Sequence, residues 1–261
     1  MSEKIMAFNL DTVVKQNRLI HEEIRIKTLQ IRTAANTMQV NSSPQLAIQL
    51  LKQHGLIQLP INNPYFGGAI FVKGHTRVPV LNTALPRVNQ YFTAWHEVYH
   101  FYFDEVSFNH FIGTDNIMEE RKADYFSSLM LLGNLMPYFN ELSETDFISK
   151  IFQCMDTFQA PYKAVLISLY EHAWINGNEV VMKAVKENFD VQFTDIASRF
   201  RKLGLDDSLV TPSNIVNLAG LSAKIQAAQK EYPELSYHGD NARFFENITK
   251  EISLIMGDAN A

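Results

Sequence analysis

The β-prone residues of this chain are confined to one stretch, residues 56–85, and this confinement constrains the fold more than any other feature. Short runs at 69–73 and 77–82 are separated by Gly74, as is typical of strands joined by a turn. Pro79 lies inside the second run, and because proline lacks a backbone N–H, we expect that run to be an edge strand. Helical patterns precede and follow the stretch. A sheet and helices that come in separate blocks predict an α+β fold.

One long helix is predicted over residues 11–39, which contain neither proline nor glycine. Apolar side chains recur there at spacings near three and four, as in a helix with one apolar face. Such a helix either packs on its own domain or forms a seam with a second copy or a partner protein. We assign residues 1–40 to this N-terminal element. A break at 41–44 and a second helix that ends at Gly55 follow it.

The chain beyond about residue 89 predicts almost only helices. Pro137 and the polar stretch 140–145 form the best candidate for a domain boundary. The chain then divides into a domain of residues 41–140, which holds the sheet, and a helical C-terminal domain of residues 141–261 with a regulatory or substrate-docking role. The expected helices are 89–104, 116–134, 144–156, 161–175, 178–188, 192–203, 212–230 and 240–256.

The charge balance argues against nucleic-acid binding. The formal net charge of the chain is -5, and residues 185–261 contain fewer basic than acidic side chains. Contacts with phosphates need a surplus of lysine and arginine. We therefore do not expect this chain to bind nucleic acid directly.

The single cysteine and the apolar composition bear on the compartment. Cys154 cannot form an internal disulfide and lies among apolar residues, so we expect a buried structural thiol in a reducing compartment. The first residues lack the apolar core of a signal peptide, and no run approaches the roughly 18 apolar residues of a membrane span. These features predict a soluble cytoplasmic protein.

The motif HEVYH, residues 96–100, lies within one of the predicted helices. Two histidines four residues apart share one face of a helix, so His96 and His100 can bind the same zinc ion. Glu97 projects beside them, where its carboxylate can take a proton from zinc-bound water. A pair of histidines on a solvated helix surface is the alternative, and the apolar neighbours of the motif argue against it. The motif predicts a zinc centre with Glu97 as the catalytic base.

A third zinc ligand is expected from another helix, because a catalytic zinc usually has three protein ligands. Glu120 is the favoured ligand, and Glu119 is the second choice. Asp124 lies four residues after Glu120 and therefore shares its helix face. It is placed to accept a hydrogen bond from the distal N–H of a ligand histidine. The predicted ligands are thus His96, His100 and Glu120, with Asp124 supporting one imidazole.

These segments resemble the ImmA/IrrE family of metallopeptidases from about residue 44 to 137. The resemblance includes the turn at 55–60, the strand end at 80–82, and the run from Arg87 through Phe92 and Thr93 to the motif at 96–100. It closes with Glu120, Ala123, Asp124 and Phe126 in the pattern E-x-x-A-D-x-F. Trp95 and Tyr99 depart from the family, which usually has smaller residues there.

The resemblance implies a zincin-like catalytic domain with a small β-sheet, followed by a mainly helical C-terminal region. It also implies an intracellular zinc endopeptidase. Its protein substrate would be a helix-turn-helix transcriptional repressor of a mobile element, a prophage or a stress regulon. The alternative is a non-catalytic, zinc-stabilised interaction module that partners a transcriptional regulator. Glu97 favours the enzyme, because a purely structural zinc site has no use for a base at that position.

Overall fold

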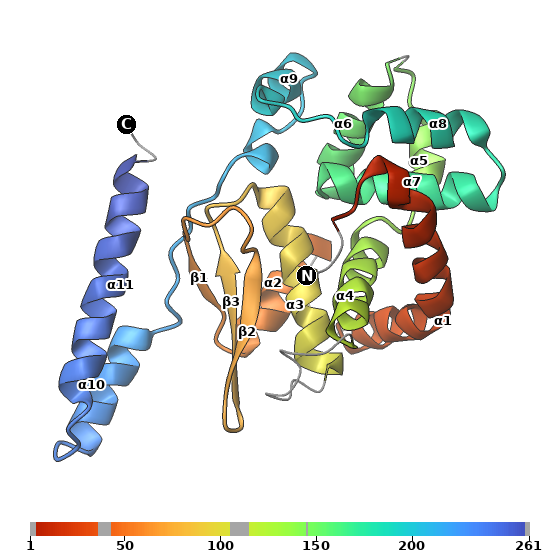
Figure 1. Cartoon of the computed structure of the whole chain (residues 1–261). Coiled ribbons are helices and arrows are strands. Elements are labelled where there is room, and N and C mark those ends of the chain that lie inside the picture. Colours follow the sequence, from red (N-terminus) through yellow and green to blue (C-terminus); the bar gives the residue numbers. More distant parts are fainter. Residues whose placement is uncertain (1–3, 36–42, 105–114, 145, 259–261) are drawn as a thin grey trace.

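The computed structural model describes residues 4–35, 43–104, 115–144 and 146–258, and it has the predicted α+β class. A short 3-10 turn at Ala7–Asn9 leads into the first helix. The elements are α1 Leu10–Ala35, α2 Ser43–Gln53, β1 Ile57–Leu59, β2 Gly68–Lys73, β3 Thr76–Asn82, α3 Arg87–Phe103, α4 Asp115–Leu131, α5 Leu135–Glu141, α6 Phe147–Phe158, α7 Tyr162–Ile175, α8 Glu179–Asn188, α9 Ile196–Lys202, α10 Leu221–Glu231 and α11 His238–Asp258. One small sheet, formed by residues 57–82, lies beside α2 and α3 (Figure 1).

Helix α1 packs on its own chain through one face. Its buried residues include Val13, Ile20, Ile24 and Ile31, which follow the expected helical spacing. This confirms the first interpretation for residues 10–35, whereas the predicted residues 36–39 lie outside the described part of the chain. The opposite face carries exposed apolar side chains, so a seam with a second copy stays a prediction.

The sheet has the strand order β1-β3-β2, so β3 is the central strand and the expectation of an edge strand at 77–82 is wrong. β2 and β3 are antiparallel, whereas β1 and β3 are parallel. β1 pairs only with residues 80–82 of β3, so Pro79 lies just beyond the end of β1. On that side no strand of the described chain faces Pro79, and its missing N–H therefore removes no sheet hydrogen bond. A proline thus fits into a strand that is central over only half of its length.

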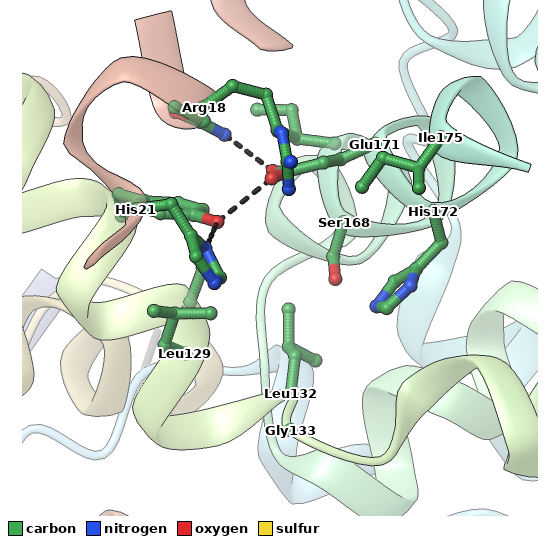
Figure 2. Close-up of a pocket in the computed structure, with 13 residues that line it drawn as sticks. Arg18, His21, Leu129, Leu132, Gly133, Ser168, Glu171, His172 and Ile175 are labelled. Carbon is green, nitrogen blue, oxygen red and sulfur yellow. Dashed lines mark hydrogen bonds between the residues drawn. The ribbon is translucent and has the colours of Figure 1, made fainter. Parts of the chain in front are cut away.

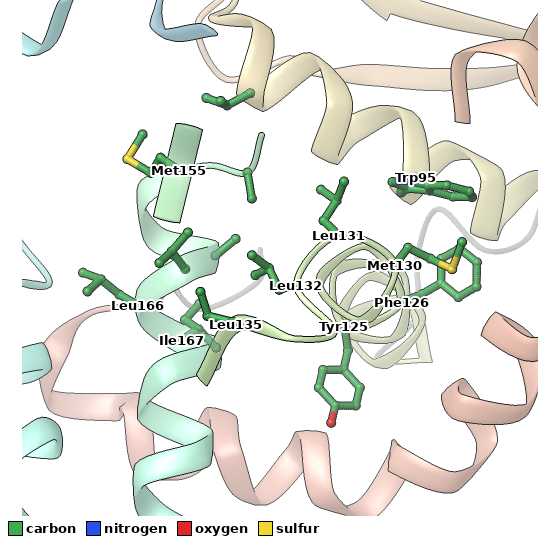
Figure 3. Close-up of a cluster of buried hydrophobic side chains, with 14 of the residues drawn as sticks. Trp95, Tyr125, Phe126, Met130, Leu131, Leu132, Leu135, Met155, Leu166 and Ile167 are labelled. Carbon is green, nitrogen blue, oxygen red and sulfur yellow. The ribbon is translucent and has the colours of Figure 1, made fainter. Parts of the chain in front are cut away.

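Helix α3 lies between the sheet and α4, which makes it the centre of the first half of the fold (Figure 1). Its residues Trp95 and Tyr99 are fully buried. The Trp95 ring meets the Phe126 ring of α4 edge to face, with centroids 6.0 Å apart. Figure 3 shows these rings beside Met130 and Leu131 in the cluster that joins the two helices. The large aromatic residues therefore fix how α3 and α4 pack.

Two segments differ from the sequence prediction. A helix, α5, forms across Pro137, which lies in its first turn, where a backbone N–H has no partner within the helix. The helix expected at 212–230 begins only at Leu221. Residues 211–217 instead run past β1 and the start of α3, where Asn217 and Gln58 exchange two backbone hydrogen bonds. This segment covers the outer edge of β1. It pairs backbone groups that would be free at an unpaired edge.

Residues before and after residue 140 contribute to the same buried core. Phe126 and Leu135 precede this residue and Ile151 and Leu166 follow it, and all four belong to the same cluster of buried side chains. The division into domains at residue 140 stays a prediction. Helices α10 and α11 lie on the other side of the sheet from α1 (Figure 1), and they contact mainly each other.

Burial also determines the state of the one cysteine. Cys154 of α6 is fully buried, as predicted, and burial raises the pKa of its thiol to about 12. The thiol is therefore protonated at neutral pH and behaves as a small apolar side chain. Among the described residues, no helix is both long and apolar enough to cross a membrane.

Candidate metal centre

Helices α3 and α4 bring the three predicted ligands together. His96 and His100 lie one turn apart on α3, and their Nε2 atoms are 3.0 Å from each other. The carboxylate of Glu120, on α4, lies 3.2 Å from His96 Nε2 through one oxygen and 3.5 Å from His100 Nε2 through the other. One ligand atom from each of the three residues lies within 4.8 Å of the others, which is a separation that a single metal ion can bridge.

Each histidine of the cluster has a carboxylate behind it. Asp124 Oδ1 lies 3.1 Å from His96 Nδ1, as predicted. Asp104 Oδ2 lies 3.0 Å from His100 Nδ1, and sequence reasoning missed this residue. A carboxylate can only accept, so both Nδ1 atoms carry hydrogen and both Nε2 atoms face the centre. The signal was available, because Asp104 follows His100 by four residues at the end of α3.

The rotation of α4 about its axis places the two candidate glutamates, Glu119 and Glu120, against different neighbours. Tyr99 Oη donates to Glu119 Oε2 at 2.9 Å, and Lys122 Nζ lies 2.9 Å from Glu119 Oε1. Lys27 of α1 also donates to Tyr99 Oη, at 3.1 Å. Glu119 is therefore held on the side of α4 that faces α1, outside the cluster, and Glu120 is the acid beside the histidines.

Electrostatics give the two histidines different affinities for protons. Burial favours the neutral ring of His96, but the carboxylates of Asp124 and Glu120 outweigh it and raise its pKa well above the ordinary value. Burial and the neighbouring His96 charge lower the pKa of His100. The hydrogen bond with His96 keeps the pKa of Glu120 below its usual range. His96 therefore holds a second ring proton more readily than His100 does.

Zinc binding is therefore expected to weaken as the pH falls. The proton on His96 Nε2 competes with the metal below the raised pKa of this ring, and the competition disappears above it. Competition with a chromogenic chelator, measured between about pH 6 and pH 8, checks this. In an Asp124→Asn variant the His96 ring holds its proton less tightly, so zinc affinity should begin to fall only at a lower pH than in the wild type. An affinity that is independent of pH in the wild type would contradict this assignment of the proton.

Glu97 is almost completely buried beside the cluster. Its side chain is 5% exposed, and burial raises its pKa to about 7, although the His96 charge opposes this shift. A carboxyl group with a pKa near neutrality can both accept and return a proton at working pH. Glu97 lies one residue after His96 on the part of α3 that faces the start of β2. The geometry thus suits a proton carrier next to the metal ligands.

Two glycines at the start of β2 allow the strand to approach Glu97 and Thr93 closely. An added Cβ at Gly68 would lie 2.8 Å from the Val80 carbonyl oxygen and 3.1 Å from Glu97 Oε1. At Gly67 it would lie 2.6 Å from Thr93 Oγ1. The buried Asn82 side chain supports this approach, because it binds the backbone of the loop at 61–66 that precedes the glycines.

A Gly68→Ala substitution is expected to destabilise the fold by about 1–3 kcal/mol, since the new methyl group meets backbone and Glu97. Chemical unfolding monitored by circular dichroism measures the loss. The matched control is Gly239→Ala in α11, where an added Cβ meets no atom within 4 Å. We expect the control to be at least as stable as the wild type, because alanine favours the helix more than glycine does. A Gly68→Ala variant with wild-type stability would show that β2 does not approach α3 this closely.

The cluster of His96, His100 and Glu120 is the one group in the described part of the chain in which three or more His, Cys, Asp or Glu side chains are placed to hold a metal ion. The five residues predicted for the site thus meet at one place, and Asp104 joins them. Neither a scan of protein-family models nor searches of curated proteins and of solved structures find a match to this chain.

Proposed function

We propose that this chain is an intracellular zinc-dependent endopeptidase with a zincin-like catalytic domain. The observation that carries the proposal is the convergence of His96, His100 and Glu120 within 4.8 Å, with Glu97 buried beside them. A merely structural zinc site needs only ligands. The buried acid next to the ligands favours catalysis. Burying a carboxyl group costs stability, and buried acids with shifted pKa values are typical of active sites.

The donor set of the cluster fits zinc. Two imidazole nitrogens and one carboxylate oxygen are ligands that zinc accepts, and three protein ligands leave a position open for a small molecule. The carboxylates of Asp124 and Asp104 hold both rings in the tautomer that directs Nε2 to the centre. When bound, a zinc ion supplies a Lewis acid that polarises a carbonyl group and lowers the pKa of water.

Glu97 then acts as the proton carrier of the reaction. Its carboxylate takes a proton from the attacking water and returns it to the amine of the cleaved peptide bond. The position of Glu97 under Gly68 restricts its side chain, so the accepting oxygen is held in place before substrate arrives. The pKa of about 7 suits both steps, because the group is neither a strong acid nor a strong base at neutral pH.

Strand β2 is the sheet edge that we propose for the substrate. β3 is paired on both sides over its second half, whereas β2 has β3 on one side and no described strand on the other. β2 begins at Gly68, next to Glu97. An extended peptide that adds to this edge through main-chain hydrogen bonds would pass beside the metal ligands. The resemblance to ImmA/IrrE peptidases makes a helix-turn-helix transcriptional repressor the proposed substrate.

Cleavage of such a repressor tests the proposal. The zinc-loaded full chain is incubated with purified candidate helix-turn-helix repressors, and intact-mass spectrometry follows the products. We expect two fragments whose masses add up to that of the repressor plus one water molecule. They should be absent after treatment with a chelator and should return when zinc is added. A stable complex with an intact repressor would instead favour the non-catalytic interaction module.

A further inference from the structure

Helices α1, α4 and α7 line a partly open cavity of about 230 Å³ that the proposed metal centre does not use. α4 separates the two regions: Glu120 and Asp124 face α3, whereas Tyr125 points toward α1 (Figure 3). Because a water molecule takes up about 30 Å³ in the liquid, the cavity has room for a small organic molecule. Figure 2 shows the side chains from the three helices that surround it.

A hydrogen-bond chain with one acid, Glu171, forms one side of this cavity. Asn17 Nδ2 donates to Glu171 Oε2 and Tyr125 Oη donates to Glu171 Oε1, both at 2.8 Å. His21 Nδ1 lies 2.8 Å from Tyr125 Oη. The phenol hydrogen is already used toward Glu171, so His21 Nδ1 must be the donor. Both oxygens of the buried acid therefore have a donor from the protein, and the acid does not need a ligand to satisfy it.

Besides the buried Asn17 Oδ1, three further polar side chains at the cavity have no hydrogen-bond partner. The side chains of Arg18, Ser168 and His172 line the cavity and make no hydrogen bond or ion pair within the described chain. All three can donate hydrogen bonds. The buried Arg121 interacts with the charges of both Asp124 and Glu171, whereas Arg18 has no ion pair among the described residues. The three free donors favour a ligand that accepts hydrogen bonds, and the positive charge of Arg18 favours an anion among such ligands.

The rest of the wall is apolar. Leu129 of α4, Leu132 directly after α4 and Ile167 of α7 contribute aliphatic surface. A ligand that satisfies both parts of the cavity has one anionic group and a compact apolar body. We propose that this cavity binds a small amphipathic monocarboxylate, with its carboxylate on Arg18, Ser168 and His172 and its apolar body against the leucines. This binding does not depend on the proposed peptidase activity.

Binding of hexanoate and benzoate to the full chain tests the proposal. Isothermal titration and thermal unfolding are measured with each acid and with its neutral counterpart, hexanol or benzamide. We expect saturable binding of at least one acid at millimolar concentrations and at least about tenfold weaker binding of its neutral counterpart. Absence of saturable binding by both acids, or equal binding of the neutral compounds, would overturn the proposal.

Two variants locate the binding in the cavity. Arg18→Gln removes an exposed charge and should weaken binding of the acid at least about tenfold. Ser168→Leu fills the space and should abolish binding, provided that circular dichroism shows an unchanged fold. The matched control is Lys15→Gln, which removes an exposed charge from α1 that does not line the cavity and should leave binding unchanged. Wild-type affinity in Arg18→Gln would overturn the assignment of the carboxylate.

Discussion

A Glu97→Gln variant is expected to keep the fold and the zinc and to lose cleavage by about 10²–10⁴-fold. Glutamine has nearly the same shape as glutamate, so it fits the restricted space under Gly68. It cannot accept a proton at neutral pH, and the proposed reaction requires this acceptance. The rate of repressor cleavage, measured together with zinc content and circular dichroism, gives the comparison.

The matched control for Glu97→Gln is Glu22→Gln, which makes the same chemical change at an exposed position on α1. We expect this control to cleave at the wild-type rate. If Glu97→Gln cleaved as fast as the wild type, another group would have to take the proton. If it lost zinc as well as activity, Glu97 would support the metal centre and the loss of activity would not identify a base.

Variants of the metal ligands are expected to show a large loss of zinc affinity. His96→Ala or His100→Ala should abolish tight zinc binding, because each removes one of three ligands. Glu120→Ala should lower zinc affinity far more than Glu119→Ala, since Glu119 is bonded to Tyr99 and Lys122. Asp124→Asn and Asp104→Asn should each cost about 10–100-fold, as is typical of groups that orient a ligand.

Elemental analysis and competition with a chromogenic chelator rank these variants. His54→Ala is the matched control, since His54 contacts Tyr102 and lies outside the cluster. A larger loss of zinc in Glu119→Ala than in Glu120→Ala would mean that α4 is rotated by one residue relative to the arrangement described above. Full zinc occupancy in both histidine variants would rule out the ligand assignment.

The local part of the site could be predicted from sequence because it depends on helix geometry. The spacing of His96 and His100, and that of Glu120 and Asp124, follow from residues that share a helix face. The choice between Glu119 and Glu120 depends on how α4 is rotated against α3. That rotation is set by packing such as the contact of Trp95 with Phe126, which periodicity does not reveal.

The sequence predictions that were wrong concern segments whose conformation depends on residues distant in the chain. Pro79 fits in β3 because β1 is short, and a single sequence does not give the length of a neighbouring strand. Residues 211–217 have helical neighbours in the sequence, but they form irregular backbone that is hydrogen-bonded to Gln58 and Thr83. The bond between Asn17 and Glu171 also joins distant parts of the chain. Asn17 interrupts the apolar stripe of α1, and only the fold shows that its side chain binds Glu171 of α7.

The position of zinc in a crystal tests the central claim most directly. Anomalous diffraction at the zinc absorption edge locates the metal without assuming its ligands. We expect one zinc ion per chain, within about 2.0–2.2 Å of Nε2 of His96, Nε2 of His100 and a carboxylate oxygen of Glu120. A crystal grown with zinc in which these three residues hold no metal, or in which zinc binds other side chains instead, would contradict the account.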